Sequence, residues 1–564
     1  MKLKNIYQVI ALAAATLSLT SCNDWLNLLP DNEQVTEDYW KSKEDVESVV
    51  ASGYYYMRQA VPTVINWGEL RGGDFYNLGS GLDATKLQDF DMLPSNNLSR
   101  YTTFYQVISM ANSVLKYAPG VQTEDDTYYD AMMRSHLCEA YFQRAWAYSI
   151  LVKNFKEVPL ITDAYVNDDA EMKLPKASES RIIAQIKSDV EAALATGAAK
   201  GTYETEWQTK GRATKWALYA LMADICLWNH EYDECIRYAN EILSATDAIR
   251  PVFMADMSSW YEIFYPGLSN ESIFELYWDY NTEGKNNNFT SCFPVLGTIS
   301  GGSNPGFCNL TETAIARMAE ETADVLRNNS SLTLDQRVGR MYLATYITNS
   351  ASWNGTQFTC GNQMAIWKYR GTDVVDMNTV RVHTDADFIL YRVADVMLMK
   401  AEALVMKGEA SWENAVSILN QIRNRAGLPD YIDLTAATKD ADIAALDQYT
   451  LLSEVLDQRE MEFLGEAHRW YDVLRLARYD ATFAPEGTVE DTQAESYEAY
   501  KTGGFGDNVF QYKQKAIDII AAYNQTTSAM QLQSVLQNSW AWYLPLPESD
   551  IQSNKNLKQN PYYE

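Results

Sequence analysis

Apolar residues recur along most of the chain with the spacing of one face of an α-helix. Ser42 and Asp45 have capping-box spacing, in which polar side chains satisfy the first backbone N–H groups of a helix. The apolar positions that follow, up to Met57, continue at i, i+3, i+4 and i+7. The same period predicts further helices over residues 101–115, 132–153, 180–196, 212–229, 232–245, 387–408, 411–425 and 447–479. We therefore expect many helices joined by short turns.

Two of these stretches are typical of a tetratricopeptide-like helix pair. Within residues 212–243, small Ala223 stands twelve residues before small Cys235, which is the separation of the two small packing positions of that motif. Residues 393–425 form a second, looser pair. Small residues are needed because the two helices of a unit cross closely. The pattern predicts a scaffold that buries a continuous core, with ordinary helix packing as the alternative.

Three stretches between the helices have a different composition. Residues 62–98, 246–310 and 344–386 are rich in Gly, Asn, Ser, Thr and aromatic residues, and residues 273–280 read as a short β-segment. Long loops in a compact protein are usually functional, and aromatic loops on a rigid scaffold favour a binding protein. The predicted fold class is mainly α, with a tetratricopeptide-like helix-pair scaffold and a loop-rich region that carries short β-segments.

The first residues have the pattern of an export signal. Two lysines precede an apolar run over residues 9–19, and small residues lead from that run to Cys22. The run is shorter than the roughly 20 residues that a membrane span requires. The pattern resembles a bacterial lipobox, so we expect a signal peptide over residues 1–21 and lipid modification of Cys22, which would anchor the chain. An ordinary signal peptide followed by a cysteine is the alternative.

The charge of the chain excludes several partners. Its 564 residues carry a formal net charge of −29. Binding to nucleic acid or to anionic lipid through general attraction requires a basic surface, so neither is expected. Hydrophobic residues make up 47%, which is enough for a large core, and no low-complexity linker divides the chain. We expect a single body over residues 22–564.

Cysteine and histidine offer little for metal or catalytic chemistry. The chain has seven cysteines without a CxxC pair, and it contains no HExxH, GxSxG or P-loop pattern. A nucleophile–histidine system therefore has little support, and we expect no metal ligands and no cofactor. Cys292, Cys308 and Cys360 lie in loop-like sequence, where an exported protein can form a disulfide. The helical stretches hold three further cysteines that read as small buried apolar residues, Cys138, Cys226 and Cys235.

Short motifs extend over the mature chain from one end to the other. In chain order they are Cys22–Leu26, Gly211–Lys215, Asp387–Val396, Lys400–Ala403, Asn420–Gly427, Arg459–Phe463, Arg469–Arg475, Leu544–Glu548 and Gln559–Tyr563. Together they resemble the SusD/RagB family, the surface lipoproteins of glycan-uptake systems in Bacteroidetes. Glu466-Ala467-His468-Arg469 departs slightly, because the family more often has Glu-Gly before its arginine.

The resemblance implies attachment to the outer leaflet of the outer membrane and no catalysis. It also implies a partner, a SusC-like TonB-dependent transporter over which such proteins sit as a lid. The body divides into an N-terminal part with ligand loops over residues 22–310 and a C-terminal part over 311–564. The charged residues of the motifs read as structural ion pairs between helices, namely Arg392, Asp395, Glu402, Arg423, Arg425, Arg459, Glu460, Glu462, Arg469, Asp472 and Arg475.

Aromatic residues beside amides or carboxylates in the loops are the candidates for sugar binding, because a sugar ring stacks its C–H face on an aromatic ring while polar groups bind its hydroxyls. Three places qualify, the first with Trp67, Arg71, Asp74 and Tyr76, the second with Trp278, Tyr280 and Asn281, and the third with Trp353 and Asn354. For any one aromatic, packing in the core is the alternative. The acidic charge favours neutral over sulfated or uronate-rich glycans.

The sequence therefore predicts a lipid-anchored surface protein that captures oligosaccharides for a TonB-dependent transporter. A RagB-like protein that captures peptides, with the same transporter-lid role, is one alternative. A lipoprotein scaffold that binds another protein on its concave face is a second. A glycoside hydrolase is the competing enzyme class, and it would require two carboxylates that face each other across a sugar.

Overall fold

The computed structural model describes residues 39–564 with internal gaps, at 78–80, 165–172, 257–259, 261, 265, 284–291, 294–307, 312, 315, 319–345, 349–351, 354–357, 360–363, 371–385, 481–482, 484–510 and 525. For some residues of the short strands only the backbone is described. The predicted signal peptide and Cys22 lie outside the described residues. None of the described helices combines the length and the apolar character that crossing a membrane requires.

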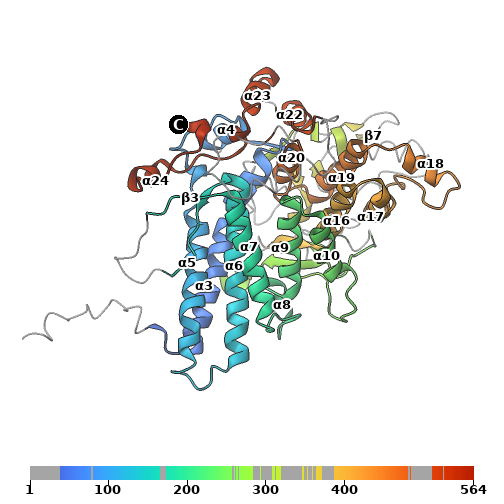
Figure 1. Cartoon of the computed structure of the whole chain (residues 1–564). Helices are drawn as coiled ribbons and strands as arrows, with labels where there is room; N and C mark the ends of the chain where they lie inside the picture. The colour runs from blue at the N-terminus through green and yellow to red at the C-terminus, as the bar shows by residue number, and fades with distance from the viewer. Residues whose placement is uncertain are drawn as a thin grey trace, which may run out of the picture.

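Four long helices form the first part of the body and lie side by side (Figure 1). They are α3 (Lys43–Ile65), α5 (Thr102–Val121), α6 (Asp130–Phe155) and α7 (Glu179–Ala195). The predicted capping box at the start of α3 is confirmed. Ser42 Oγ accepts a hydrogen bond from the Asp45 N–H, and the Asp45 carboxylate accepts one from the Ser42 N–H at 2.8 Å.

Two helix pairs follow the pattern predicted from small residues. The pairs are α9 (Lys215–Trp228) with α10 (Tyr232–Leu243), and α16 (Val393–Lys407) with α17 (Trp412–Arg425). Ala223 and Cys235 are both 0% exposed, so both predicted small packing residues are buried. Cys235 Sγ lies 3.8 Å from the Met399 carbonyl oxygen, which places α10 directly against α16. The mainly helical, tetratricopeptide-like scaffold is therefore confirmed.

The helix predicted over residues 447–479 is interrupted. The structure has α19 (Gln448–Phe463) and α20 (Arg469–Arg478), separated by a turn in which Gly465 and Ala467 have positive φ angles of 79° and 63°. The helical spacing of apolar residues continues across the break because both helices bury apolar side chains. The C-terminal part adds α22 (Tyr512–Tyr523) and α23 (Ala529–Leu536). Short helices complete the described parts, namely α4 (Leu82–Gln88), α8 (Glu206–Gly211), α11 (Tyr280–Glu283), α15 (Trp367–Arg370), α18 (Lys439–Ala444) and α24 (Glu548–Ser553).

The described strands form five antiparallel pairs. These are β4 (Ser272–Leu276) with β10 (Phe388–Arg392), β1 (Phe75–Asn77) with β5 (Cys308–Leu310), β2 (Val158–Pro159) with β3 (Lys176–Ala177), β6 (Tyr346–Thr348) with β9 (Met364–Ile366), and β7 (Ser352–Trp353) with β8 (Phe358–Thr359). In the β4–β10 ribbon, Phe388 pairs with Leu276 and Arg392 with Ser272. The β-segment predicted over 273–280 is confirmed over 273–276 only, because β4 ends at Leu276 and α11 begins at Tyr280. The predicted helix over 387–408 begins only at Val393, because a short apolar run fits a buried strand as well as a helix.

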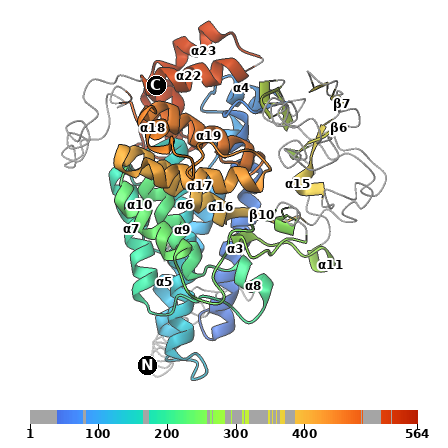
Figure 2. The same cartoon turned by 90° about the vertical axis from the view of Figure 1, so that its right-hand side faces the viewer.

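The stretch predicted as a loop over residues 62–98 is more regular than expected. Helix α3 continues through Pro62 and passes into a π-helix, η1 (Asn66–Leu70), all of whose residues are buried. The loop-rich region gathers on one side of the helical body, where Figure 2 shows β6, β7, α11 and α15 together. One continuous apolar core extends from Met57 to Leu557 and includes residues of both predicted parts. The division of the body at residue 310 stays a prediction.

Candidate functional site

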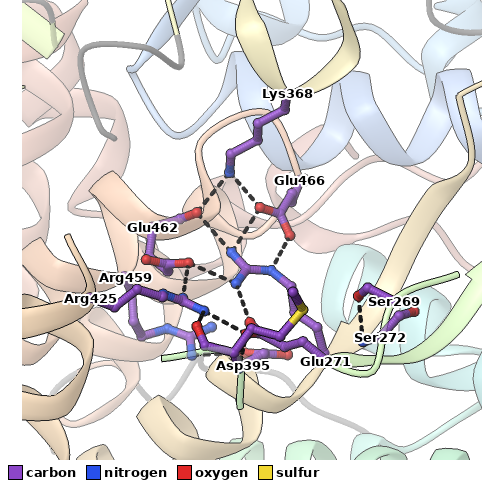
Figure 3. Close-up of polar contacts among 11 residues, drawn as sticks. Ser269, Glu271, Ser272, Lys368, Asp395, Arg425, Arg459, Glu462 and Glu466 are labelled. Atoms are coloured by element: carbon purple, nitrogen blue, oxygen red, sulfur yellow. Dashed lines mark hydrogen bonds and ion pairs between the residues drawn. The ribbon is translucent and has the colours of Figure 1, made fainter. Parts of the chain in front are cut away.

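Buried charges fix the base of the β4–β10 ribbon (Figure 3). Arg392, the last residue of β10, donates to Glu462 at 2.7 Å, to Glu466 at 2.8 Å and to Glu271 at 3.0 Å. Arg425 of α17 donates to Glu271 and to Glu462, both at 2.5 Å. None of these side chains is more than 2% exposed. The network therefore ties the start of β4 and the end of β10 to α17 and α19.

Opposite charges keep Glu466 ionised. Burial alone would raise the pKa of Glu466, but the guanidinium of Arg392 and the ammonium of Lys368 lower it to about 2. A second group continues the pattern, with Arg459 donating to Asp395 and Asp472 at 2.9 Å each. The prediction that the motif charges form structural ion pairs between helices is confirmed. The carboxylates of Glu271, Glu462 and Glu466 are each paired with a buried arginine.

The segment after β4 carries the second group of predicted ligand residues. The Trp278 N–H donates to Asp387 Oδ1 at 2.6 Å, just before β10 begins. Arg58 of α3 lies over the Trp278 ring, 5.1 Å from its centroid, and donates to the Tyr277 carbonyl oxygen at 3.1 Å. Arg58 also pairs with Glu283 of α11 at 2.5 Å. Half-buried Trp278 is thus fixed through its backbone next to β10, and its ring packs under an arginine that α11 also holds.

Polar contacts set the turn into α11. Asp279 accepts hydrogen bonds from the Asn281 N–H and from the Thr282 hydroxyl, both at 3.0 Å. Tyr280 is half-buried and Asn281 is exposed. The segment thus carries an exposed amide three residues after a half-buried tryptophan. We keep Trp278, Tyr280 and Asn281 as proposed ligand contacts.

Trp207 is a partly exposed aromatic residue that the sequence did not single out. It lies on α8, is 43% exposed, and stacks on Tyr277 with ring centroids 5.5 Å apart and planes 23° from parallel. Lys210 fastens α8 to the ribbon, because its Nζ donates to the Ser272 carbonyl oxygen at 2.6 Å. We call Trp207, Tyr277 and Trp278 the aromatic cluster. In the sequence, Trp207 is an isolated tryptophan in a polar stretch. Nothing in that stretch indicates that Trp207 contacts Tyr277.

The first group of predicted ligand residues is mostly part of the core, and this corrects the expectation. Trp67 is 0% exposed and lies in η1, where it stacks on Phe104 at 5.3 Å and meets Phe155 edge-on. Arg71 is buried, donates to Asn154, and covers the Trp470 ring at 4.3 Å. Asp74 is also fully buried. A buried ring has no free face for a sugar, so we no longer propose Trp67, Arg71 or Asp74 as ligand contacts.

The remaining candidates stay predictions. Tyr76 is half-buried in β1, where it pairs with Asn309. Trp353 is described only by its backbone in β7, and Asn354 lies outside the described residues. The side chains of Cys308 and Cys360 also lie outside them, so the disulfide stays a prediction. The predicted buried thiols are confirmed for the three helical cysteines, Cys138, Cys226 and Cys235. Within the described ranges, no His, Cys, Asp and Glu side chains converge as metal ligands.

Comparison with known proteins identifies the family. Residues 276–563, more than half of the chain, match the model of the SusD family, and residues 24–227 match a family described as "Starch-binding associating with outer membrane". A SusD-like protein of Formosa agariphila is 25% identical over 516 residues, which cover 87% of this chain and 95% of that protein. A SusD-like protein of Bacteroides ovatus is 23% identical over 510 residues, which cover 84% and 83%.

Solved structures share the fold. A SusD superfamily protein of Bacteroides vulgatus superposes with a TM-score of 0.67 at 18% identity, covering 93% of this chain and 100% of that one. A protein described as a laminarin-binding SusD-like protein superposes with a TM-score of 0.59 at 19% identity, covering 92% and 99%. SusD family proteins are non-catalytic binding proteins. The match to the family model over more than half of its length shows that this chain belongs to the SusD family.

Proposed function

We propose that this protein is a lipid-anchored surface protein that captures oligosaccharides and delivers them to a SusC-like TonB-dependent transporter. Membership of the SusD family, with a first half matching a family described as starch-binding and outer-membrane associated, supports this role. A laminarin-binding protein shares the fold, which makes laminarin the first probe. Delivery to the transporter rests on the resemblance of the motifs to this family.

The observation that carries sugar binding is the position of Trp278. Arg58 of α3 lies over its ring and is itself paired with Glu283 of α11, while Asp387, just before β10, accepts a hydrogen bond from its backbone N–H. A ring fixed in advance loses little side-chain entropy when a ligand binds, so stacking on it translates into affinity. The exposed Asn281 nearby supplies an amide for hydroxyl groups. An aromatic ring and an amide are groups that bind a sugar, whereas a glycoside hydrolase requires two carboxylates that face each other across it.

The test is isothermal titration of the chain from Asn23 onward with a fixed set of probes. Laminarin and amylopectin represent neutral glycans, polygalacturonate and carrageenan represent charged ones, and a casein digest represents peptides. Saturable binding of a neutral glycan is the expected result. Binding of the peptide digest without any glycan would replace this proposal with the peptide-capturing alternative, and release of reducing sugar during the titration would indicate a hydrolase.

A further inference from the structure

We propose that Asp74 and Glu460 share one buried proton, which makes the contact between strand β1 and the helical body sensitive to pH. This inference is independent of the proposed function. Asp74 directly precedes β1 and is 0% exposed, and Glu460 of α19 is 2% exposed. Two carboxyl groups removed from water in this way must find cations and hydrogen-bond donors or keep a proton.

The backbone of Asp74 belongs to the ribbon that β1 forms with β5. Its carbonyl oxygen accepts a hydrogen bond from the Thr311 N–H at 2.8 Å, one residue after β5 ends at Leu310. Gly73, with a φ of 93°, lies so close to α22 that an added Cβ would stand 2.6 Å from Tyr523 Cβ. Asp74 therefore lies where the β1–β5 ribbon is attached to the helices.

The side chains around the pair supply too few donors for two carboxylates. A hydrogen bond links the carboxyl groups of Asp74 and Glu460, and such a bond requires a proton on one of them. Without that proton, neither Asp74 oxygen nor Glu460 Oε2 accepts a hydrogen bond from a donor group of any described residue. The Tyr523 hydroxyl donates to the other oxygen, Glu460 Oε1, at 2.7 Å. One shared proton therefore supplies the missing donor.

A single arginine faces both carboxyl groups. Arg469 of α20 lies 2.8 Å from Glu460 Oε2, an ion-pair contact without hydrogen-bond geometry, and 3.6 Å from Asp74 Oδ1. Burial and the charges of Glu460 and Glu69 raise the pKa of Asp74 well above its usual value, although Arg469 opposes them. One positive charge balances one carboxylate, so a proton on Asp74 leaves Glu460 and Arg469 as a neutral pair.

The other charged groups on the neighbouring elements have partners of their own. They form the ion pairs Arg317–Asp457, Arg459–Asp472, Lys86–Asp91 and Lys368–Glu466. Helix α4 meets β1 through an amide, because Gln88 Oε1 accepts a hydrogen bond from the Asn77 N–H at 2.7 Å. The charge of Asp74 therefore depends chiefly on burial, Glu460, Glu69 and Arg469.

The shared proton couples the position of the ribbon to pH. A raised pKa means that the folded protein binds the proton more tightly than the unfolded chain, in which an aspartate titrates near roughly pH 3.9. The stabilisation is therefore fully present below about pH 4 and is lost as pH rises through the raised pKa. Above that value two adjacent carboxylates face one arginine, and their repulsion pushes β1 away from α19.

Infrared difference spectroscopy detects the proton, because the C=O stretch of a neutral carboxyl group lies apart from that of a carboxylate. The chain from Asn23 onward is compared at pH 6 with Asp74→Asn and Glu460→Gln, whose amides replace the proton with an N–H donor. Asp126→Asn makes the same change at an exposed residue and is the control. Thermal unfolding shows which variants are folded, and either buried variant suffices for the comparison.

We expect Asp74→Asn and Glu460→Gln each to lose the same neutral-carboxyl band, and Asp126→Asn to lose none. Hydrogen exchange between pH 6 and 9 then measures the contact. Protection of peptides that contain β1 should fall by up to about tenfold per pH unit in wild type, the limit for one proton, and much less in Asp74→Asn. A folded buried variant that keeps the full band would refute the shared proton. Equal pH dependence of β1 protection in wild type and Asp74→Asn would refute the pH-sensitive contact.

Discussion

The Ala467 backbone N–H donates a hydrogen bond to Glu69 Oε1 at 2.5 Å, across 398 positions of the chain. Glu69 lies in the buried π-helix η1, and Ala467 lies in the positive-φ turn between α19 and α20. This bond joins the segment that matches the starch-binding family to the segment that matches the SusD family. The turn between α19 and α20 thus supplies a hydrogen-bond donor to a buried carboxyl group.

Stability should depend on pH through Glu69. Burial raises the pKa of this carboxyl group to about 8, well above the roughly 4.3 of an unfolded chain. The folded state therefore binds the proton more tightly, and the resulting stabilisation is present below about pH 4 and is lost as pH rises toward 8. Glu69→Gln, which keeps the acceptor for Ala467, should remove up to about 1.4 kcal/mol per pH unit of this dependence.

Urea unfolding at pH 5, 6, 7 and 8 measures that dependence. The exposed Glu124→Gln is the control, because it makes the same chemical change on the surface. Parallel pH profiles for Glu69→Gln and the wild type would show that the buried carboxyl group does not titrate as we expect.

Removing one partner from the buried charge network should be severely destabilising. Arg392→Met leaves Glu271, Glu462 and Glu466 without their shared cation, and breaking a buried pair in this way costs about 3–5 kcal/mol. Glu234→Gln breaks the exposed pair with Arg237 and should change the free energy of unfolding very little. Guanidinium unfolding of both variants checks the contrast, and equal midpoints would contradict the structural role of the network.

Two glycine-to-alanine substitutions should change the free energy of unfolding in opposite directions. A Cβ at Gly68 would stand 2.3 Å from the Ala467 carbonyl oxygen, so Gly68→Ala must push η1 away from the turn, at a cost of about 1–3 kcal/mol. Gly120 lies in α5 with nothing within 4 Å of an added Cβ, and Gly120→Ala should stabilise by up to about 1 kcal/mol. Thermal unfolding of both variants measures the two changes in stability. A neutral Gly68→Ala would mean that the close approach is not required.

Membrane attachment should depend on a single thiol. Cys22→Ala removes the residue that the lipobox pattern marks for acylation, so the protein should move from the membrane fraction to the soluble fraction. Detergent partition of cell extracts measures this, and Cys138→Ala, a change at a buried helical thiol, is the control. Retention of Cys22→Ala in the membrane fraction would contradict the lipid anchor.

The helical scaffold could be read from the sequence because its signals are local. The capping box at Ser42 and the small residues Ala223 and Cys235 act within one helix or one pair, and the structure has all of them in place. The charged motif residues could also be predicted to form ion pairs, because acidic and basic residues occur on consecutive helices that pack together.

The site residues depended on contacts that the sequence does not display. Trp67, in a stretch rich in glycine and asparagine, looked like a loop residue, but Phe104 and Phe155 enclose it. Trp207 stacks on Tyr277, seventy positions away, and gains its importance only through that contact. The strand over residues 388–392 was hidden in a helical pattern because its partner β4 lies more than a hundred positions earlier.

The most direct test of the account is calorimetric titration of wild type and Trp278→Ala with the neutral glycan that wild type binds, with Tyr129→Ala as a surface control. Removal of the ring over which Arg58 lies should abolish detectable binding or weaken it by at least about tenfold, while Tyr129→Ala keeps wild-type affinity. Wild-type affinity in a folded Trp278→Ala protein would contradict the central claim that this protein captures sugars at the aromatic cluster.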